Sequence, residues 1–245
     1  MDFKSVKEIF RDKIDINLYV PLSQKMEIDL TYAIYEKEKM ILIFGEAGNG
    51  KSFLMNKVHH NLLEKKDKDF QLYFISNPFE ESEAIDELFL LESDIHRVVF
   101  IDEAQTLSEE KIDRLRMLAD NNAYTIILAT HEKEAKKLFA KKHFKTRINC
   151  FLNLKPLKLQ EIELFIVSKL LNNGYNDIAG LFNKSNFKLI NKITNGNLRE
   201  INRLLYKTFD ILDYFKKHYP NKISLKKIDN KYIEMADMDL KGINA

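Results

Sequence analysis

Short apolar runs, each bounded by polar residues or turn formers, recur through the first part of the chain. They have the length and composition of β-strands and are followed by polar, helix-favouring stretches. Runs such as ILIF and VVFI show no polar alternation, which is typical of strands buried on both faces of a parallel sheet. The predicted strands are Met40–Phe44, Gln71–Ser76, Val98–Ile101, Thr125–Thr130 and Cys150–Leu154.

Helical spacing of apolar residues lies before and between these runs. Gln24–Glu36 precedes the first strand, Ser52–Lys65 follows it, and Ala84–Glu92 and Lys111–Ala119 flank the third. Alternation of strand and helix is the pattern of a wound α/β sheet. We therefore predict an α/β fold with five parallel strands.

The pattern changes after Pro156, where no further strand is predicted. Breaks at Asn173-Gly174, Asn195-Gly196 and Pro220 separate helical stretches. The sequence thus predicts an N-terminal segment at 1–20, an α/β domain at 21–157 and an all-helical domain at 158–245. The predicted C-terminal helices are Leu159–Asn172, Asp177–Phe182, Asn186–Thr194, Leu198–His218 and Leu225–Met238.

Composition narrows the class of protein. The 245 residues are 45% hydrophobic and 31% charged, which is typical of a globular protein with a core. A single cysteine, Cys150, allows neither an internal disulfide nor a cysteine cluster for zinc. The charged start and the lack of any apolar run near 20 residues lead us to expect no signal peptide, no membrane span and a cytoplasmic location.

Charge is unevenly distributed although the net charge is only +2. Residues 155–245 hold 16 Lys and Arg against 10 Asp and Glu, whereas residues 1–154 hold 23 against 27. A basic C-terminal part is suited to nucleic acid, lipid headgroups or an acidic protein. A solvated lysine surface without a partner is the simpler explanation.

The strongest chemical signal is GEAGNGKS, which matches GxxxxGK[ST] between a predicted strand and a predicted helix. Its glycines allow backbone N–H groups to turn inward around an anion, and the next helix adds its N-terminal dipole. Lys51 is placed to reach the β- and γ-phosphates of ATP, and Ser52 to bind Mg²⁺. The predicted nucleotide-binding residues are Gly45, Glu46, Ala47, Gly48, Asn49, Gly50, Lys51, Ser52 and Phe53.

A second signal is VVFIDE, four apolar residues that end in Asp102 and Glu103. A buried strand of this kind fixes its last carboxylates at the carboxyl end of the sheet, where ligands bind in wound α/β folds. About 50 residues after a P-loop, the pair predicts Mg²⁺ binding by Asp102. Glu103 is then predicted to polarise the attacking water.

Three further residues are weaker candidates. Thr130 ends the strand TIILAT and is predicted to reach the γ-phosphate, with His131 as the alternative. Arg199 stands in the first turn of a long helix, where a cation does not favour the helix dipole, so a separate role is plausible. Arg147 precedes the last strand, and a structural surface role is an alternative for both arginines.

Together these motifs resemble the AAA+ superfamily of ATPases, over roughly residues 20–215. The resemblance implies that Thr130 is sensor 1, that Arg199 is sensor 2 on a helical lid, and that Arg147 is an arginine finger offered to a neighbouring subunit. It also implies a homo-oligomer and an ATPase that uses ATP and Mg²⁺. Many relatives cradle adenine just before the first helix, which here is Tyr19 to Pro21.

Within AAA+ proteins, FIDEAQ and GNLREINRLL resemble the ATPase domain of general secretion pathway protein A and the transposition helper ATPases. The first resemblance implies a motor for a secretion, type IV pilus or DNA-uptake machine. Its partner is then an inner-membrane component, which would place the protein peripherally at that membrane. Two alternatives remain open: a DNA-acting ATPase, such as a transposition helper or helicase loader, and a slow nucleotide-dependent switch.

Overall fold

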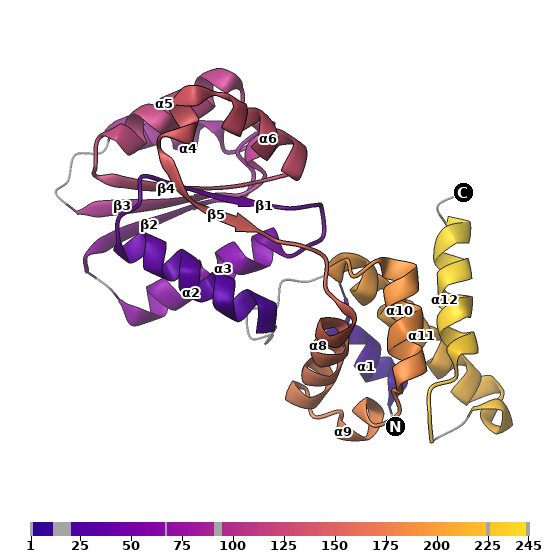
Figure 1. The fold of residues 1–245 in the computed structure, drawn as a ribbon. Coiled ribbons are helices and arrows are strands. Elements are labelled where there is room, and N and C mark those ends of the chain that lie inside the picture. Colours follow the sequence, from indigo (N-terminus) through magenta and orange to yellow (C-terminus); the bar gives the residue numbers. More distant parts are fainter. Residues whose placement is uncertain (1, 12–20, 67, 91–94, 224–225, 244–245) are drawn as a thin grey trace. The chain divides into compact units, whose positions relative to one another are not determined.

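The computed structural model describes residues 2–11, 21–66, 68–90, 95–223 and 226–243, which form two compact units (Figure 1). The α/β unit comprises Gln24–Lys155, and the helical unit comprises Met1–Ser23 together with Pro156–Ala245. Each unit has its own hydrophobic core, so each is described by itself.

The α/β unit holds one five-stranded sheet in the order β2-β3-β4-β1-β5, in which every neighbouring pair is parallel. This confirms the predicted α/β class and the five parallel strands. The strands are β1 Met40–Phe44, β2 Phe70–Ile75, β3 His96–Ile101, β4 Tyr124–Thr130 and β5 Ile148–Asn153. β3 and β4 are buried along their whole length, which explains why their sequences show no polar alternation.

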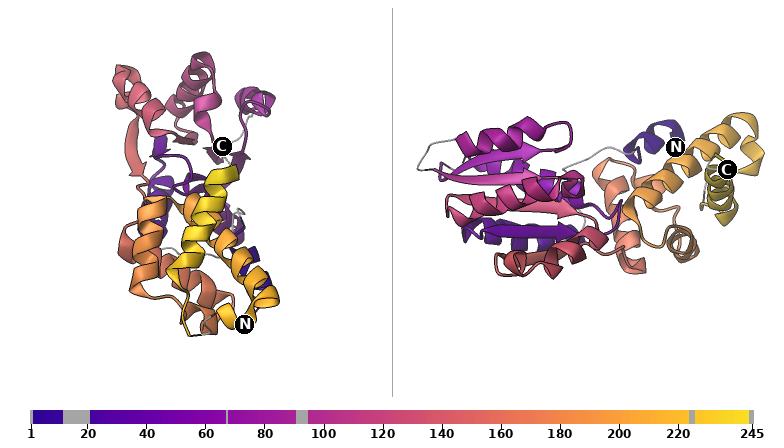
Figure 2. Two further views of the ribbon diagram at one scale, coloured as in Figure 1. Left: turned by 90° about the vertical axis from the view of Figure 1, so that its right-hand side faces the viewer. Right: turned by 90° about the horizontal axis from the view of Figure 1, so that it is seen from above.

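Helices cover both faces of this sheet (Figures 1 and 2). One apolar layer joins the sheet to α2 and α3, around Leu30, Leu54 and Val58. The other joins it to α4, α5, α6 and α7, around Leu115 and Phe144. The helices are α2 Pro21–Tyr35, α3 Lys51–Lys65, α4 Ser82–Glu87, α5 Glu109–Asp120, α6 Glu132–Ala140 and α7 Lys142–Lys145, with short 3-10 turns η1 Leu88–Leu90 and η2 Ala104–Thr106.

Among the helices of the α/β unit that differ from the sequence prediction are α4 and α6. The helix predicted at Ala84–Glu92 starts earlier, at Ser82, and changes to a 3-10 turn at Leu88; residues 91 and 92 lie outside the described part. α6 was not predicted, because EKEAKKLFA offers few apolar positions, and of these Ala135 and Leu138 are buried against the sheet.

The helical unit is built around α11, with α1 and α12 packed along it. Its elements are α1 Phe3–Ile9, α8 Leu159–Asn172, α9 Asn176–Ala179, α10 Lys184–Thr194, α11 Leu198–His218, η3 Pro220–Lys222 and α12 Asn230–Ile243. The predicted Asp177–Phe182 helix ends early, and the predicted Leu225–Met238 helix begins late. The backbone N–H of Ile228 donates to Leu181 O, so both segments run as loops side by side.

The N-terminal helix belongs to the helical unit and not to a separate segment at 1–20. Phe3, Val6 and Phe10 are buried in its core, and Phe3 and Phe10 stack on Phe209 at centroid distances of 6.1 and 5.6 Å. A seven-residue helix is marginal alone, so this long-range packing stabilises it. The sequence spacing of three apolar residues could not show which partner they bury against.

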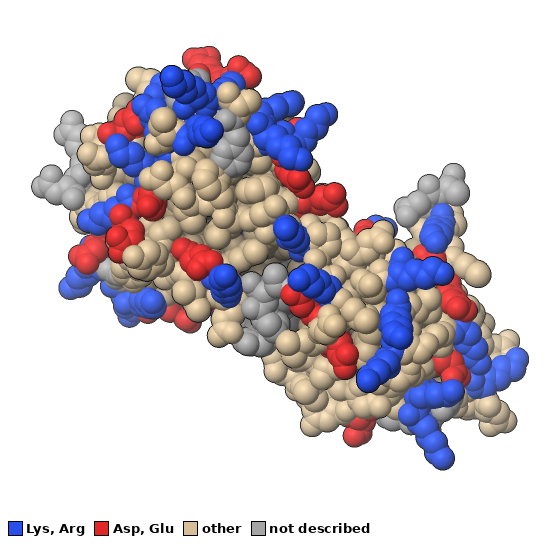
Figure 3. Space-filling view, in the orientation of Figure 1, with Lys and Arg blue, Asp and Glu red and all other residues tan. Residues whose placement is uncertain are grey.

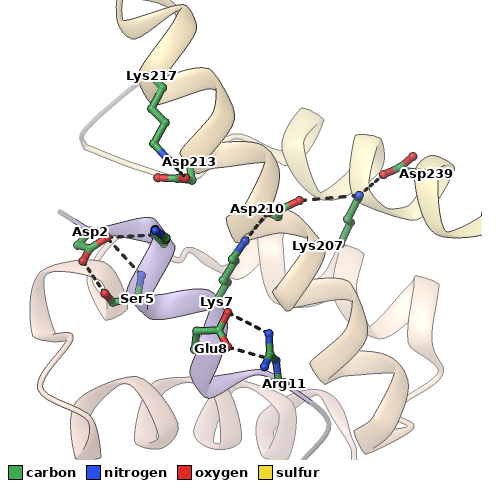
Figure 4. A network of polar contacts seen from close by, with 11 residues as sticks. Asp2, Ser5, Lys7, Glu8, Arg11, Lys207, Asp210, Asp213, Lys217 and Asp239 are labelled. Carbon is green, nitrogen blue, oxygen red and sulfur yellow. Dashed lines mark hydrogen bonds and ion pairs between the residues drawn. The ribbon is translucent and has the colours of Figure 1, made fainter.

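Ion pairs reinforce this packing (Figure 4). Lys7 on α1 lies 2.6 Å from Asp210 on α11, and Lys207 on α11 lies 2.5 Å from Asp239 on α12. Lys207 also lies 3.9 Å from Asp210, so one chain of alternating charges links three segments that are far apart in the sequence.

Candidate nucleotide-binding site

The loop after β1 is fixed against the end of β5. A Cβ atom on Gly45 would lie 2.4 Å from Leu154 O, so only glycine fits there. The same oxygen accepts a hydrogen bond from Asn49 Nδ2 at 3.0 Å, and Leu154 N donates to Phe44 O at 2.8 Å. These contacts hold the loop at the carboxyl end of β1.

The backbone of this loop surrounds the buried ammonium group of Lys51. Gly48 and Gly50 adopt φ values of 83° and 93°, which favour glycine. Lys51 is only 5% exposed, and its Nζ donates to Gly45 O at 3.0 Å and Glu46 O at 3.1 Å. Because α3 starts at Lys51, its free N–H groups and dipole face the same space, as in a phosphate-binding helix terminus.

The structure brings Ser52 and Asp102 together, although 50 residues separate them. Asp102 is 6% exposed, and its carboxylate is hydrogen-bonded by the Ser52 hydroxyl and by the Glu103 N–H at 2.9 Å. Burial raises the pKa of the Asp102 carboxyl, and the two hydrogen bonds and the Lys51 charge only partly oppose this. A buried carboxylate next to a hydroxyl is a donor set that suits a hard cation such as Mg²⁺.

Among the described residues, no group of three or more His, Cys, Asp or Glu side chains could form a metal cage. In proteins, Mg²⁺ keeps several waters and is held by one or two protein oxygens together with substrate phosphates. Ser52 and Asp102 would hold it here.

Glu103 lies at the same edge in a strained backbone conformation, with φ 48°. Such conformations cost roughly 1–3 kcal/mol and cluster at functional sites. The Glu103 carboxylate accepts a hydrogen bond from Gln105 Nε2 and lies 3.5 Å from His131 Nε2. Its side chain remains 45% exposed and is therefore open to solvent.

Thr130 ends β4, directly beside Phe44, the last residue before the P-loop. It is 1% exposed, and its Oγ1 has no hydrogen-bond partner in the part of the chain that the structure describes. Leaving a buried hydroxyl unpaired costs about 1–3 kcal/mol, so a ligand atom is the natural partner. The register places this hydroxyl next to β1, the strand that leads into the P-loop.

Two residues in this group carried no predicted site role or only a secondary one. Gln105 stands in the FIDEAQ string, but a glutamine there has no general signature. His131 was only the alternative to Thr130, whereas the structure places it beside Glu103. Gln105 and His131 both lie next to the Glu103 carboxylate because η2 and the end of β4 are close together in the fold. Local sequence does not indicate that these two segments are close.

The remaining predicted residues of the loop lie in different environments. Glu46 and Ala47 are exposed, and Phe53 on α3 is half-buried. Tyr19 and Val20, named as adenine neighbours, lie outside the described residues, and Pro21 begins α2.

Arg147 lies at the opposite, amino-terminal edge of the sheet, just before β5. Its Nε and Nη2 donate to the two carboxylate oxygens of Asp120 at 2.6 and 2.9 Å. Because the P-loop follows the carboxyl end of β1, Arg147 cannot serve the site of its own chain. A finger role would require a second chain.

Arg199 belongs to the helical unit, in the exposed first turn of α11. The Asn197 side chain caps this helix and accepts from Arg199 N at 3.1 Å. Gly196 has φ 78°, and a Cβ there would lie 2.1 Å from Leu157 O. Leu157 N also donates to Gly196 O at 2.8 Å, so the turn before Arg199 is fastened to the segment that enters the helical unit.

Several solved structures share this fold. They include the Aeropyrum pernix ORC1 protein in complex with DNA, with 12% identity over 96% of this chain and 69% of that chain and a TM-score of 0.70. The Thermotoga maritima RuvB Holliday junction branch migration motor shows 18% identity over 95% and 73%, with a TM-score of 0.62. Domain III of the Thermotoga maritima replication initiation protein DnaA shows 14% over 93% and 95%, with a TM-score of 0.60.

At these identities the likeness establishes the fold alone, and this fold agrees with the resemblance to AAA+ ATPases that the motifs carry. No curated protein sequence matches the chain. The closer resemblance to general secretion pathway protein A is not confirmed by these comparisons. Within the described residues, no helix is long and apolar enough to cross a membrane.

One protein family is matched directly by the sequence. The match spans residues 17–143 and so includes the P-loop, Asp102, Glu103 and Thr130. Since it covers more than half of the 245 residues, the chain belongs to the family described as Novel STAND NTPase 5.

Proposed function

We propose that this protein binds ATP with Mg²⁺, hydrolyses the γ-phosphate and uses the cycle to act on DNA. The observation that carries the first part is the meeting of Ser52, Asp102 and Glu103 beside the P-loop. A buried carboxylate, a hydroxyl and a solvent-open carboxylate at one sheet edge supply the groups that phosphoryl transfer to water requires.

Each residue then has a distinct task in an in-line attack by water. Lys51 and the loop N–H groups hold the β- and γ-phosphates, and Glu103 orients and polarises the water. The Thr130 hydroxyl donates to the γ-phosphate or the water. Ser52 and Asp102 would hold Mg²⁺, which would supply positive charge against the phosphate oxygens.

Action on DNA has two supports. The solved structures of the same fold include a protein in complex with DNA and a Holliday junction branch migration motor. The excess of basic over acidic residues in 155–245 supplies a surface that polyanions favour. The predicted secretion or pilus role has no comparable support, so we favour the DNA-acting alternative.

The ATPase proposal is tested with Glu103→Gln, which keeps the shape but not the carboxylate. We expect ATP and Mg²⁺ binding to persist and turnover to fall by roughly 10²-fold or more. Turnover is measured with and without duplex DNA, and Lys51→Ala is the control that also loses ATP binding. Wild-type turnover in Glu103→Gln would remove Glu103 from the mechanism.

A homo-oligomer is the second part of this proposal, with Arg147 completing the neighbouring site. Arg147→Ala is expected to be inactive alone and to regain activity when mixed with Glu103→Gln, since some interfaces then pair two intact groups. An arginine finger is worth about 10³–10⁵ in rate. If mixing restores nothing, and activity per molecule is independent of concentration, the trans role is wrong.

Arg199 is proposed to report the γ-phosphate to the helical unit. ATP should protect residues 158–245 of the wild type from protease, and Arg199→Ala should lose this protection while its P-loop still binds nucleotide. Equal protection in both proteins would leave Arg199 as a helix surface residue.

A further inference from the structure

A run of 22 residues in the helical unit contains no acidic side chain. Residues 178–199 hold Lys184, Lys188, Lys192 and Arg199, but no Asp or Glu. The three lysines all lie on α10 and are exposed. In the space-filling view, Lys and Arg side chains gather over α10 (Figure 3).

The spacing of these lysines places them on one face. Successive lysines are four residues apart, so they are offset by about 40° around the helix and by about 6 Å along it. Asn191 and Asn195 fall on the same side. The result is a polar face with three cations in a row, about 12 Å long.

This arrangement is unfavourable for α10 alone. Like charges at i and i+4 repel each other, and Lys184 in the first turn opposes the helix dipole. Within the described part of the chain, none of the three lysines has an acidic partner. The neighbouring helices differ, since Lys217 pairs with Asp213 and Lys241 with Asp237, at 2.6 and 2.7 Å.

The opposite face of α10 is locked in place. Phe187 and Ile190 are buried in the core of the helical unit. Asn186 is fully buried, and its Nδ2 donates to Ile228 O at 3.0 Å and to Asn230 Oδ1 at 2.8 Å. The three lysines therefore project from a rigid platform, and little backbone entropy is lost when they bind a ligand.

We infer that Lys184, Lys188 and Lys192 form a contact surface for the phosphate backbone of DNA. This rests on the proposed function and names the surface that would carry it. A row of cations matches a regularly charged polyanion, and lysine binds phosphate as a point charge without reading bases. A lipid surface fits less well, because membrane-binding helices insert apolar residues and the apolar residues of α10 face the core.

The test is DNA binding by a Lys184→Ala, Lys188→Ala, Lys192→Ala triple variant, measured by fluorescence anisotropy with a labelled 30-base-pair duplex across a salt series. We expect affinity to fall at least tenfold. The slope of log K against log salt should decrease in magnitude by about 2–3, because three phosphate contacts are lost. ATPase activity without DNA and the melting temperature should stay near wild type.

The matched control removes three other exposed lysines of the same unit, Lys217, Lys231 and Lys241, with the same change in net charge. It should keep the wild-type slope. If the triple variant and the control bind equally, the α10 surface is wrong while DNA action stands. If the wild type binds no DNA, or binds phosphatidylserine vesicles through these lysines and not DNA, both proposals fail.

Discussion

The two units treat their polar side chains in opposite ways. In the helical unit, Lys7, Asp210, Lys207 and Asp239 satisfy one another in a chain of ion pairs across three helices. At the edge of the α/β sheet, the Thr130 hydroxyl is buried without a hydrogen-bond partner among the described residues, and burial raises the pKa of Asp102. The sheet edge keeps costly groups that a ligand can satisfy, whereas the paired charges on α1, α11 and α12 stabilise the packing of the helical unit.

This contrast shows where function sits. A buried polar group without a partner destabilises the fold, so it persists where binding returns the energy. By the same reasoning, the repelling lysines of α10 are the exception within the helical unit. Like the buried polar groups at the sheet edge, these lysines are held in a costly arrangement that a ligand relieves. In this they differ from the paired lysines of α11 and α12.

The largest expected effect breaks the cohesion of the helical unit. Phe10→Ala removes a ring that is 1% exposed, stacks on Phe209 and lies 5.3 Å from Lys169 Nζ. Replacing a buried Phe by Ala costs about 3–5 kcal/mol. The free energy of opening measured by amide hydrogen exchange should fall by that amount in α1 and α11. It should stay unchanged in β3 and β4.

Lys4→Ala on the same helix is the control for Phe10→Ala, because Lys4 is exposed and outside the core. Unchanged exchange in α11 of the Phe10 variant would show that the N-terminal helix contributes nothing to the unit.

A second prediction separates stability from activity at the sheet edge. Asp102→Asn should lower turnover by roughly 10²–10³-fold, the range seen when one preorganised electrostatic group is removed. Because the folded-state pKa of Asp102 is raised, its ionised form opposes folding above that pKa, and protonation at lower pH relieves the cost. The ligand-free variant should therefore melt at a higher temperature than wild type at pH 7.

Mg²⁺ and ATP should raise the melting temperature of wild type by more than that of Asp102→Asn, because the variant lacks the carboxylate that would hold the cation. The two differential-scanning profiles at pH 7, with and without ligand, are the measurement. If the ligand-free variant is less stable than wild type, the ionised Asp102 carboxylate stabilises the fold, and the idea that it is kept at a cost for cation binding is wrong.

The sequence predicted the α/β unit better than the helical unit for a physical reason. Its signals are local, because a strand, a glycine loop and a helix follow one another within Met40–Lys65, and VVFIDE carries both strand and carboxylates. The packing of α1 depends on contacts with residues about 200 positions away. The sequence around Phe3 and Phe10 does not indicate which residues those are. Likewise, two contacts can be predicted only when the sheet order is known. They are the approach of Glu103 to His131 and the pairing of Arg147 with Asp120.

The smallest expected effect concerns that last pair, which is separable from any role of Arg147 in a neighbouring site. The Arg147 guanidinium lowers the pKa of the Asp120 carboxyl below its ordinary value of 3.8, so the pair stabilises the fold at neutral pH. Both side chains are partly exposed, at 24% and 34%, and such pairs are worth about 1 kcal/mol or less.

Asp120→Asn and Arg147→Ala should each lower the free energy of unfolding by that amount at pH 7, and the double variant should lose little more. A depressed carboxyl pKa contributes stability that is complete above the unfolded pKa and is lost as the pH falls through the folded-state pKa of Asp120, so all differences should vanish below that folded-state pKa. Urea unfolding of the four proteins over a pH series from pH 7 down into the acid range measures this. Asp120→Asn should keep its ATPase activity even if Arg147→Ala loses it, because only the arginine is proposed to reach a phosphate. Equal loss of activity in both variants would instead make the pair a structural clamp and Arg147 a positioning residue for β5.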